Sequence, residues 1–182
     1  MRPSPILLAL ALAAGCPAES VPGDVVVGTF DFATELLQDN CDVVNQQDPG
    51  SFSATVSYDS KTSEAYLTVG ATSMAGMLTG DRLSITASAN RTLWRPSSDA
   101  GCPGAIVERV EGRLIDEGEA HVLGLKCSTD GGLYVPDGGS ADARPDVRLI
   151  CGSISDVLSA QQDPSCTVDP CLVTYSLSGV RQ

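Results

Sequence analysis

Cysteine is the residue type with the most chemistry in this sequence, because the chain has seven cysteines and a single histidine, His121. A chain so rich in cysteine is typical of an oxidising compartment, where thiols become cross-links. Setting Cys16 aside leaves an even number of cysteines, which predicts disulfides with no leftover thiol. These disulfide candidates are Cys41, Cys102, Cys127, Cys151, Cys166 and Cys171.

Metal binding is a weaker interpretation of the same chain. Thiolate zinc sites pair two C-x-x-C motifs, whereas Cys166 and Cys171 are separated by four residues. Aspartates after Cys127 offer oxygen ligands for calcium, but their spacing matches no calcium-binding loop. These aspartates are Asp130, Asp137, Asp142 and Asp146. We therefore expect no metal site and no cofactor.

Residues for catalysis are sparse. The sequence has no G-x-S-x-G, H-E-x-x-H, P-loop or dinucleotide-binding glycine motif. His121 is the only histidine for a Ser-His-Asp arrangement, and it lies beside Val122 in a segment that alternates like a strand. Glu108 shares a face with Ile106 and Val110, so it could pair with an aspartate for glycoside hydrolysis. A solvated position at the rim is the simpler interpretation of Glu108, and we expect no catalytic site.

The N-terminus has the pattern of an export signal. Arg2 is followed by an apolar run over residues 6–14, which ends just before Cys16. The run is too short to span a bilayer, which needs about 20 residues. We expect a signal peptide over residues 1–15, a tether over 16–23, and a single β domain over 24–182.

The motif Leu12-Ala13-Ala14-Gly15-Cys16 resembles the lipobox of bacterial lipoproteins, with Ala13 where that family usually has leucine. The resemblance implies cleavage before Cys16 and acylation of its thiol and of its new amine. Acyl chains such as palmitate would then anchor the protein to membrane lipid, which predicts the outer membrane of a Gram-negative bacterium, facing the periplasm or the surface. An ordinary signal peptide cut near Ala18 is the alternative.

Charge limits the partners. The chain has 23 acidic and 11 basic residues, a formal net charge of -12, which opposes nucleic-acid binding. Membrane lipid, bound through the acyl anchor, is therefore the first expected partner. An unknown small molecule or envelope protein is the second.

Beyond Gly23 the apolar residues alternate with polar ones, which predicts an all-β domain. Short turns between consecutive strands favour an antiparallel up-and-down meander that closes into a barrel, with an open β-sandwich as the alternative. The expected strands cover residues 25–37, 52–58, 65–69, 73–79, 83–89, 105–115, 119–127 and 171–179.

The start of the first strand, Gly28-Thr29-Phe30, resembles a weakened form of the Gly-x-Trp signature of lipocalins, with phenylalanine in place of tryptophan. The resemblance implies a lipocalin-like barrel in which Arg181 packs across Phe30. The C-terminal helix pattern of that family is missing here.

Strand order predicts where the cysteines lie. If the strands alternate in direction, all six body cysteines fall at one rim, and the opposite rim has tight turns at Lys61, Gly80 and Gly118. Sequence leaves the connectivity open. The set of pairs that we expect is Cys41–Cys102, Cys127–Cys151 and Cys166–Cys171.

A stiff barrel with one disulfide-tied rim is typical of scaffolds that present recognition loops. Trp94, the single tryptophan, lies in a loop of that rim and is the candidate for ligand contact, although it could instead pack over the barrel mouth. We expect a non-enzymatic, lipid-anchored binding module. A structural or assembly lipoprotein of the outer membrane is the alternative, and a small hydrolase the third interpretation.

Overall fold

The computed structural model describes residues 21–41, 50–93, 102–123, 127, 146–160 and 169–182. The described chain forms eight strands and one short helix. In chain order these elements are β1 (Val25–Asp39), β2 (Ser51–Tyr58), β3 (Glu64–Val69), β4 (Thr72–Thr79), β5 (Arg82–Leu93), β6 (Cys102–Asp116), α1 (Glu117–Val122), β7 (Val147–Ala160) and β8 (Cys171–Arg181).

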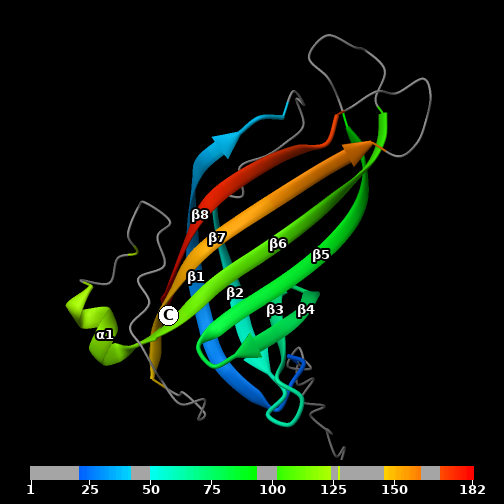
Figure 1. The fold of residues 1–182 in the computed structure, drawn as a ribbon. Coiled ribbons are helices and arrows are strands. Elements are labelled where there is room, and N and C mark those ends of the chain that lie inside the picture. The colour runs from blue at the N-terminus through cyan, green and yellow to red at the C-terminus, as the bar shows by residue number, and fades with distance from the viewer. Residues whose placement is uncertain (1–20, 42–49, 94–101, 124–126, 128–145, 161–168) are drawn as a thin grey trace, which may run out of the picture.

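The strands form a closed barrel in sequence order, in which β1 pairs with both β2 and β8. Each pair of neighbouring strands is antiparallel, so the chain runs up and down around the barrel (Figure 1). The predicted meander and its closure are confirmed, and the open sandwich is wrong.

The barrel has two ends, and each is defined by the connections that lie there. At the end called here the entry end, β1 begins, β2 turns into β3, β4 turns into β5 at Gly80, and α1 follows β6. At the far end β1 stops, β3 turns into β4 at Gly70, and β6 and β8 begin.

The expected strand at residues 119–127 is wrong, because α1 begins there instead. Asp116 caps this helix, since its carboxylate accepts a hydrogen bond of 2.9 Å from the backbone N–H of Glu119. Glu117 and Glu119 in the first turn complement the positive end of the helix. The seventh strand is instead β7, which lies between residues 127 and 171, where we expected no strand.

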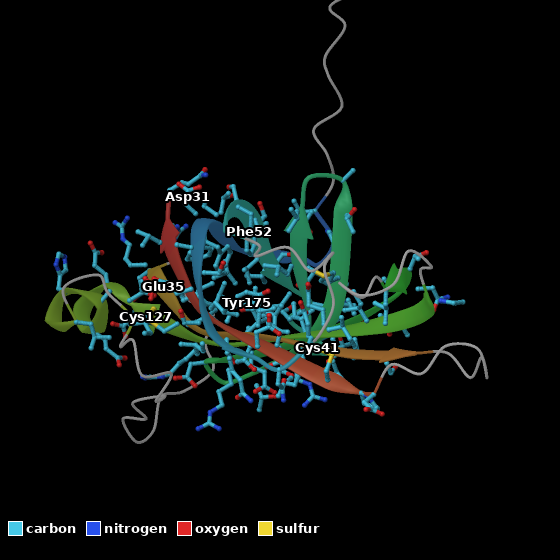
Figure 2. The ribbon with its side chains drawn as sticks, turned by 90° about the horizontal axis from the view of Figure 1, so that it is seen from above. Asp31, Glu35, Cys41, Phe52, Cys127 and Tyr175 are labelled. Carbon is cyan, nitrogen blue, oxygen red and sulfur yellow. A yellow bond between two sulfur atoms is a disulfide. The ribbon has the colours of Figure 1, made fainter. Side chains whose placement is uncertain are left out.

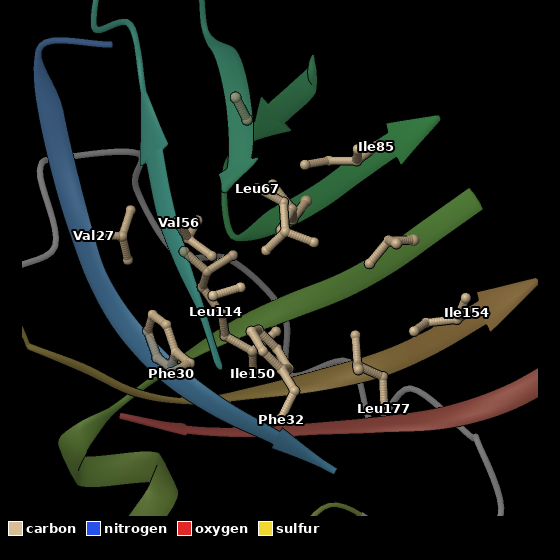
Figure 3. Close-up of a cluster of buried hydrophobic side chains, with 14 of the residues drawn as sticks. Val27, Phe30, Phe32, Val56, Leu67, Ile85, Leu114, Ile150, Ile154 and Leu177 are labelled. Atoms are coloured by element: carbon tan, nitrogen blue, oxygen red, sulfur yellow. The ribbon is translucent and has the colours of Figure 1, made fainter. Parts of the chain in front are cut away.

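Alternating side chains of the strands fill the inside of the barrel with one hydrophobic core (Figure 3). Phe30 and Val56 are completely buried, and the rings of Phe32 and Phe52 stack with centroids 5.1 Å apart. Burial of this apolar area is the main contribution to the stability of the barrel.

A second, smaller cluster lies outside the barrel wall, where α1 packs on β6 and β7. Ile115, Ala120 and Leu149 are buried there, with Leu123 packed against them. Leu149 therefore faces outward under the helix, whereas the next residue, Ile150, faces the core.

Arg181 lies at the entry end, opposite Phe30 in the β1–β8 register. Its guanidinium group donates a hydrogen bond of 3.3 Å to the carbonyl of Val147, and its side chain lies against Gly28. The hydrogen bond joins the end of β8 to the start of β7, and the packing against Gly28 joins it to the start of β1. The packing of Arg181 across the ring of Phe30 stays a prediction.

Candidate functional site

The far end of the barrel is tied by the disulfide between Cys41 and Cys171, with Cα atoms 5.1 Å apart. This bond joins the end of β1 to the start of β8. It corrects two expected pairs, because Cys41 does not bond to Cys102, nor Cys171 to Cys166. The reason is the register of the closed barrel, which brings the first and last strands side by side.

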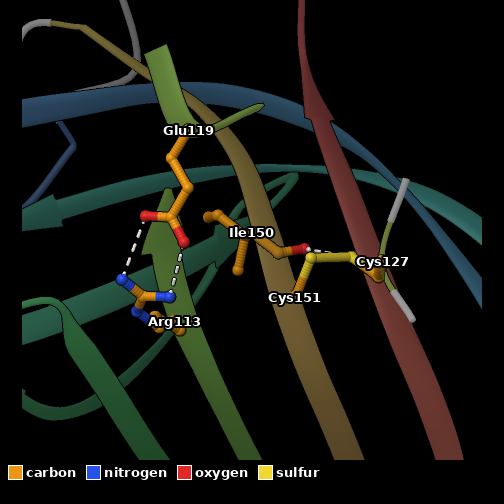
Figure 4. The surroundings of a disulfide bond; sticks show 5 residues. All are labelled: Arg113, Glu119, Cys127, Ile150 and Cys151. Atoms are coloured by element: carbon orange, nitrogen blue, oxygen red, sulfur yellow. Dashed lines mark hydrogen bonds and ion pairs between the residues drawn. A yellow bond between two sulfur atoms is a disulfide. The ribbon is translucent and has the colours of Figure 1, made fainter. Parts of the chain in front are cut away.

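The predicted pair Cys127–Cys151 is confirmed, with Cα atoms 5.4 Å apart, but it lies at the entry end. Figure 4 shows this disulfide next to Ile150 of β7, and Figure 2 shows Cys127 well apart from Cys41 in the view from above. The single stapled rim is therefore wrong. Counting residues 119–127 as a strand moved Cys127 to the wrong end.

Several predicted residues lie outside the part of the chain that can be described. The backbone of Cys102 begins β6 at the far end, as expected. Its side chain lies outside the described part of the structure. Asp146 is exposed just before β7. The predictions for the remaining residues stay predictions, namely those for Cys16, Trp94, Asp130, Asp137, Asp142 and Cys166.

The predicted catalytic candidates do not come together. His121 is exposed in the last turn of α1, on the outside of the barrel. Glu108 is partly buried on the same inward face of β6 as Val110, and it lies opposite Asp156 of β7 in the strand register. Glu108 therefore does not lie at the solvated rim as expected, but partly buried on the inward face near the middle of β6. The pair of Glu108 and Asp156 lies near the middle of β6, whereas His121 lies beyond the end of β6, in α1.

A network of charged residues holds α1 to the barrel. The Arg113 guanidinium group is 2.6 Å from Asp81 and makes two contacts of 2.8 and 3.0 Å with the Glu119 carboxylate (Figure 4). Burial disfavours the charged guanidinium, but hydrogen bonds to Asp81 and Glu119 outweigh it and raise the pKa of Arg113. Arg113 is buried, whereas Arg109 and Glu111, which lie on the same outward face of β6, are exposed.

The segment before β1 is fixed to the turn between β2 and β3. The Asp24 carboxylate accepts hydrogen bonds of 2.7 Å from both the hydroxyl and the backbone N–H of Ser60. The hydroxyl bond, followed by the backbone bond, lowers the pKa of Asp24. The buried Ser57 hydroxyl donates to the carbonyl of Pro22 at 2.6 Å. The entry point of the chain is therefore held in one place.

A row of hydroxyl side chains crosses the outer wall, one from each of the first four strands. In the strand register Thr29 lies beside Thr55, which lies beside Thr68 and then Ser73. The hydroxyl oxygens of Thr29 and Thr55 are 3.0 Å apart, and those of Thr68 and Ser73 are 2.9 Å apart. The row lines a hollow of about 630 Å³. Sequence reasoning missed this surface, since alternation predicts which residues face outward but not which ones align.

Comparisons with known proteins leave the function to be argued from the molecule itself. No family model matches the chain, and searches among curated proteins and solved structures found no significant match. Within the described ranges, no helix is both long and apolar enough to cross a bilayer. The described residues also contain no group of three or more potential metal ligands from histidine, cysteine, aspartate and glutamate.

Proposed function

We propose that this protein is a lipoprotein of the cell envelope, anchored by acyl chains on Cys16 in the outer membrane of a Gram-negative bacterium. Its barrel then serves as a non-enzymatic binding module. The anchor rests on the lipobox-like motif that ends at Cys16. The disulfides Cys41–Cys171 and Cys127–Cys151 are consistent with an oxidising compartment outside the cytoplasm.

The observation that carries the proposal is the fixed point at which the chain enters the barrel. Asp24 and Ser60 hold this point at the entry end, and a tether from Cys16 to Gly23 reaches at most about 25 Å when extended. An acyl chain on Cys16 would therefore keep the entry end close to the bilayer. The far end, with the Cys41–Cys171 disulfide, would face away from the lipid and be accessible to a partner.

Metabolic labelling with an alkyne analogue of palmitate tests the anchor. The wild type should take up label and yield a mature N-terminus at Cys16, whereas Cys16→Ser should remain uncut or leave the membrane fraction. The double variant Cys41→Ser with Cys171→Ser is the matched control, because it also replaces cysteine by serine but should keep its label. An unlabelled wild type with an N-terminus beyond Cys16 would contradict the anchor.

The orientation has a test of its own. In vesicles that contain lipids with a paramagnetic headgroup, the amide signals of Lys61 and Gly80 should broaden more than that of Gly70. Lys61 and Gly80 lie in turns at the entry end, and Gly70 lies in a turn at the far end. Equal broadening at all three positions would show that the barrel is not held with its entry end toward the lipid.

A further inference from the structure

The pairing of β4 with β5 stops partway along the barrel wall. The last register pair is Gly76 with Ile85, although β4 begins at Thr72 and β5 continues to Leu93. A side chain at Gly76 would collide with the backbone of Ile85, so the two strands touch closely at this point. Beyond it β5 runs on beside β6 alone (Figure 1).

The backbone of β5 alternates in the direction of its hydrogen bonds. The N–H of Leu114 donates to the carbonyl of Asp81 at 2.8 Å, directly next to the first pair of the β5–β6 register, Arg82 with Arg113. In an antiparallel pair, every second residue of a strand directs its N–H and C=O toward the same neighbouring strand. Ala87, which is six residues after Asp81, therefore also directs its N–H and C=O toward β6. Ser88 must then direct its own N–H and C=O the other way, toward the line of β4.

The same reasoning applies to β4. The N–H of Leu78 donates to the carbonyl of Ser63 at 2.9 Å, which sets the even-numbered residues of β4 toward β3. Ser73 therefore directs its N–H and C=O toward β5. Among the described residues, the sheet register gives neither Ser73 nor Ser88 a partner on this side. The two strands thus border an opening with backbone donors and acceptors on both sides.

The borders of this opening are exposed and carry small side chains. Ser73 and Ala75 on β4 are exposed, and so are Ser88 and Ala89 on β5. Natural edge strands are commonly protected by lysine, proline or a bulge, and none of these occurs at the four positions. The opening therefore has the features of a strand-binding edge.

We propose that this opening binds one extended polypeptide segment of a partner protein, neutral or basic in charge, as an additional strand between β4 and β5. A single extended segment has two hydrogen-bonding edges, so it can pair with Ser73 and Ser88 at once. The edge of a folded sheet, including that of a second copy, has one free side and satisfies only one border.

Charge selects among such segments. The chain has a formal net charge of -12, which favours a basic segment over an acidic one. In addition, the register row of Ala87 contains Glu108 and Asp156. An inward-facing lysine of the bound segment, placed opposite Ala87, would lie on this acidic row. This inference rests on the proposed function, because it names the class of partner that the binding module would take.

Residue-resolved hydrogen exchange on the full-length mature protein in detergent tests the inference. The probe is the peptide Thr-Val-Lys-Val-Thr-Val-Thr, and its counterpart has glutamate in place of lysine. The lysine peptide should slow exchange at Ser73 and Ser88 by at least tenfold, with little change at Ala87 and Ala89. The glutamate peptide should bind several-fold more weakly, and unchanged exchange at Ser73 and Ser88 with millimolar lysine peptide would overturn the proposal.

Two substitutions at one position supply the control. Ser88→Pro removes the N–H that faces the opening without removing a bond to β6, and it should weaken peptide binding at least fivefold. Ser88→Ala keeps the N–H and should bind as the wild type does; equal binding by both variants would contradict strand pairing. Protection of Ser88 that rises with protein concentration, without peptide, would identify a second copy as the occupant instead. Neither measurement depends on acylation of Cys16, so the labelling experiment tests the membrane anchor independently of strand binding.

Discussion

Arg181 lies directly against Gly28, so that a Cβ atom at Gly28 would be only 2.9 Å from the Arg181 Nε atom. The last residue of β8 thus occupies space that the first strand leaves open. A Cβ atom at position 28 would require a shift of the Arg181 side chain, whose guanidinium reaches the carbonyl of Val147 at 3.3 Å. The φ of Gly28 is +157°, a backbone conformation that residues with a side chain rarely adopt, so both the contact and the backbone favour glycine two residues before Phe30.

Gly28→Ala should therefore destabilise the barrel by about 1–3 kcal/mol, the usual cost of overpacking. A double-mutant cycle with Arg181→Ala separates the collision from the backbone strain, which both backgrounds share. Chemical denaturation of the four proteins should give a coupling energy of about 1 kcal/mol, with Gly28→Ala less harmful when Arg181 is absent. Additive effects would mean that Arg181 moves aside without cost.

Arg113→Met should cost about 2–3 kcal/mol, somewhat below the ~3–5 kcal/mol of a fully buried ion pair. The reason is that Asp81 and Glu119 would then face each other without the guanidinium between them. The matched control is Arg148→Met, which removes a half-exposed contact of 3.4 Å with Glu117 and should change stability by less than about 0.5 kcal/mol. Denaturation midpoints measure both, and equal losses would show that Arg113 is not the anchor of α1.

The two disulfides should differ in their contribution to the free energy of unfolding. In the loop-entropy account, the Cys41–Cys171 bond spans 130 residues and contributes about 5 kcal/mol, while Cys127–Cys151 spans 24 and contributes about 3.5 kcal/mol. Replacing each pair by alanine and comparing urea unfolding checks the order. A larger loss for the shorter loop would indicate that packing of α1, rather than chain entropy, dominates.

The entry point of the chain should loosen in acid. Hydrogen bonds from Ser60 lower the pKa of Asp24, and backbone N–H groups of Thr62 and Lys61 lower the pKa of Asp59. Because both pKa values are depressed in the folded state, their stabilising effect is present above the unfolded pKa of about 3.9 and is lost as the pH falls through the folded values.

Amide exchange at Ser60, followed from neutral to acidic pH, measures this effect. Exchange should rise, relative to its intrinsic pH dependence, below about pH 4 in the wild type. In Asp24→Asn the acceptor oxygen no longer titrates, so the additional rise should be much smaller. A variant that behaves as the wild type would place the cause at Asp59.

Most strands could be predicted from sequence because their inner and outer faces differ in polarity. In β2, for example, Ala54 and Val56 are buried while Ser53 is exposed. The signal fails in β7, where Leu149 lies under α1 and Ile150 lies in the core, so that neighbouring residues are both apolar. A strand covered on both faces loses its alternation.

The helix was missed for the opposite reason, since the segment after Asp116 alternates well enough to resemble a strand. The missed signal was the spacing of Asp116 and Glu119, which is similar to a capping box. Because residues 119–127 were counted as a strand, the chain after them was expected at the far end of the barrel. The Cys127–Cys151 bond was therefore predicted at the wrong end. The exposed edge at Ser88 could not be predicted at all, because it depends on where pairing with β4 ends.

The seam between β1 and β8 has a consequence for how the molecule is made. A polypeptide is synthesised from its N-terminus, and Cys171 follows Cys41 at a sequence separation of 130, so β1 exists for the whole time that the ribosome needs to produce this stretch. During that period the last part of β1, after Ala33, has no strand to pair with, because β2 does not reach it and β8 has not been made. Any nascent chain of intermediate length therefore carries this part of β1 as an open edge. The Cys41–Cys171 disulfide, formed when an oxidant of the compartment removes two electrons from the two thiols, can therefore lock the barrel only after β8 has arrived.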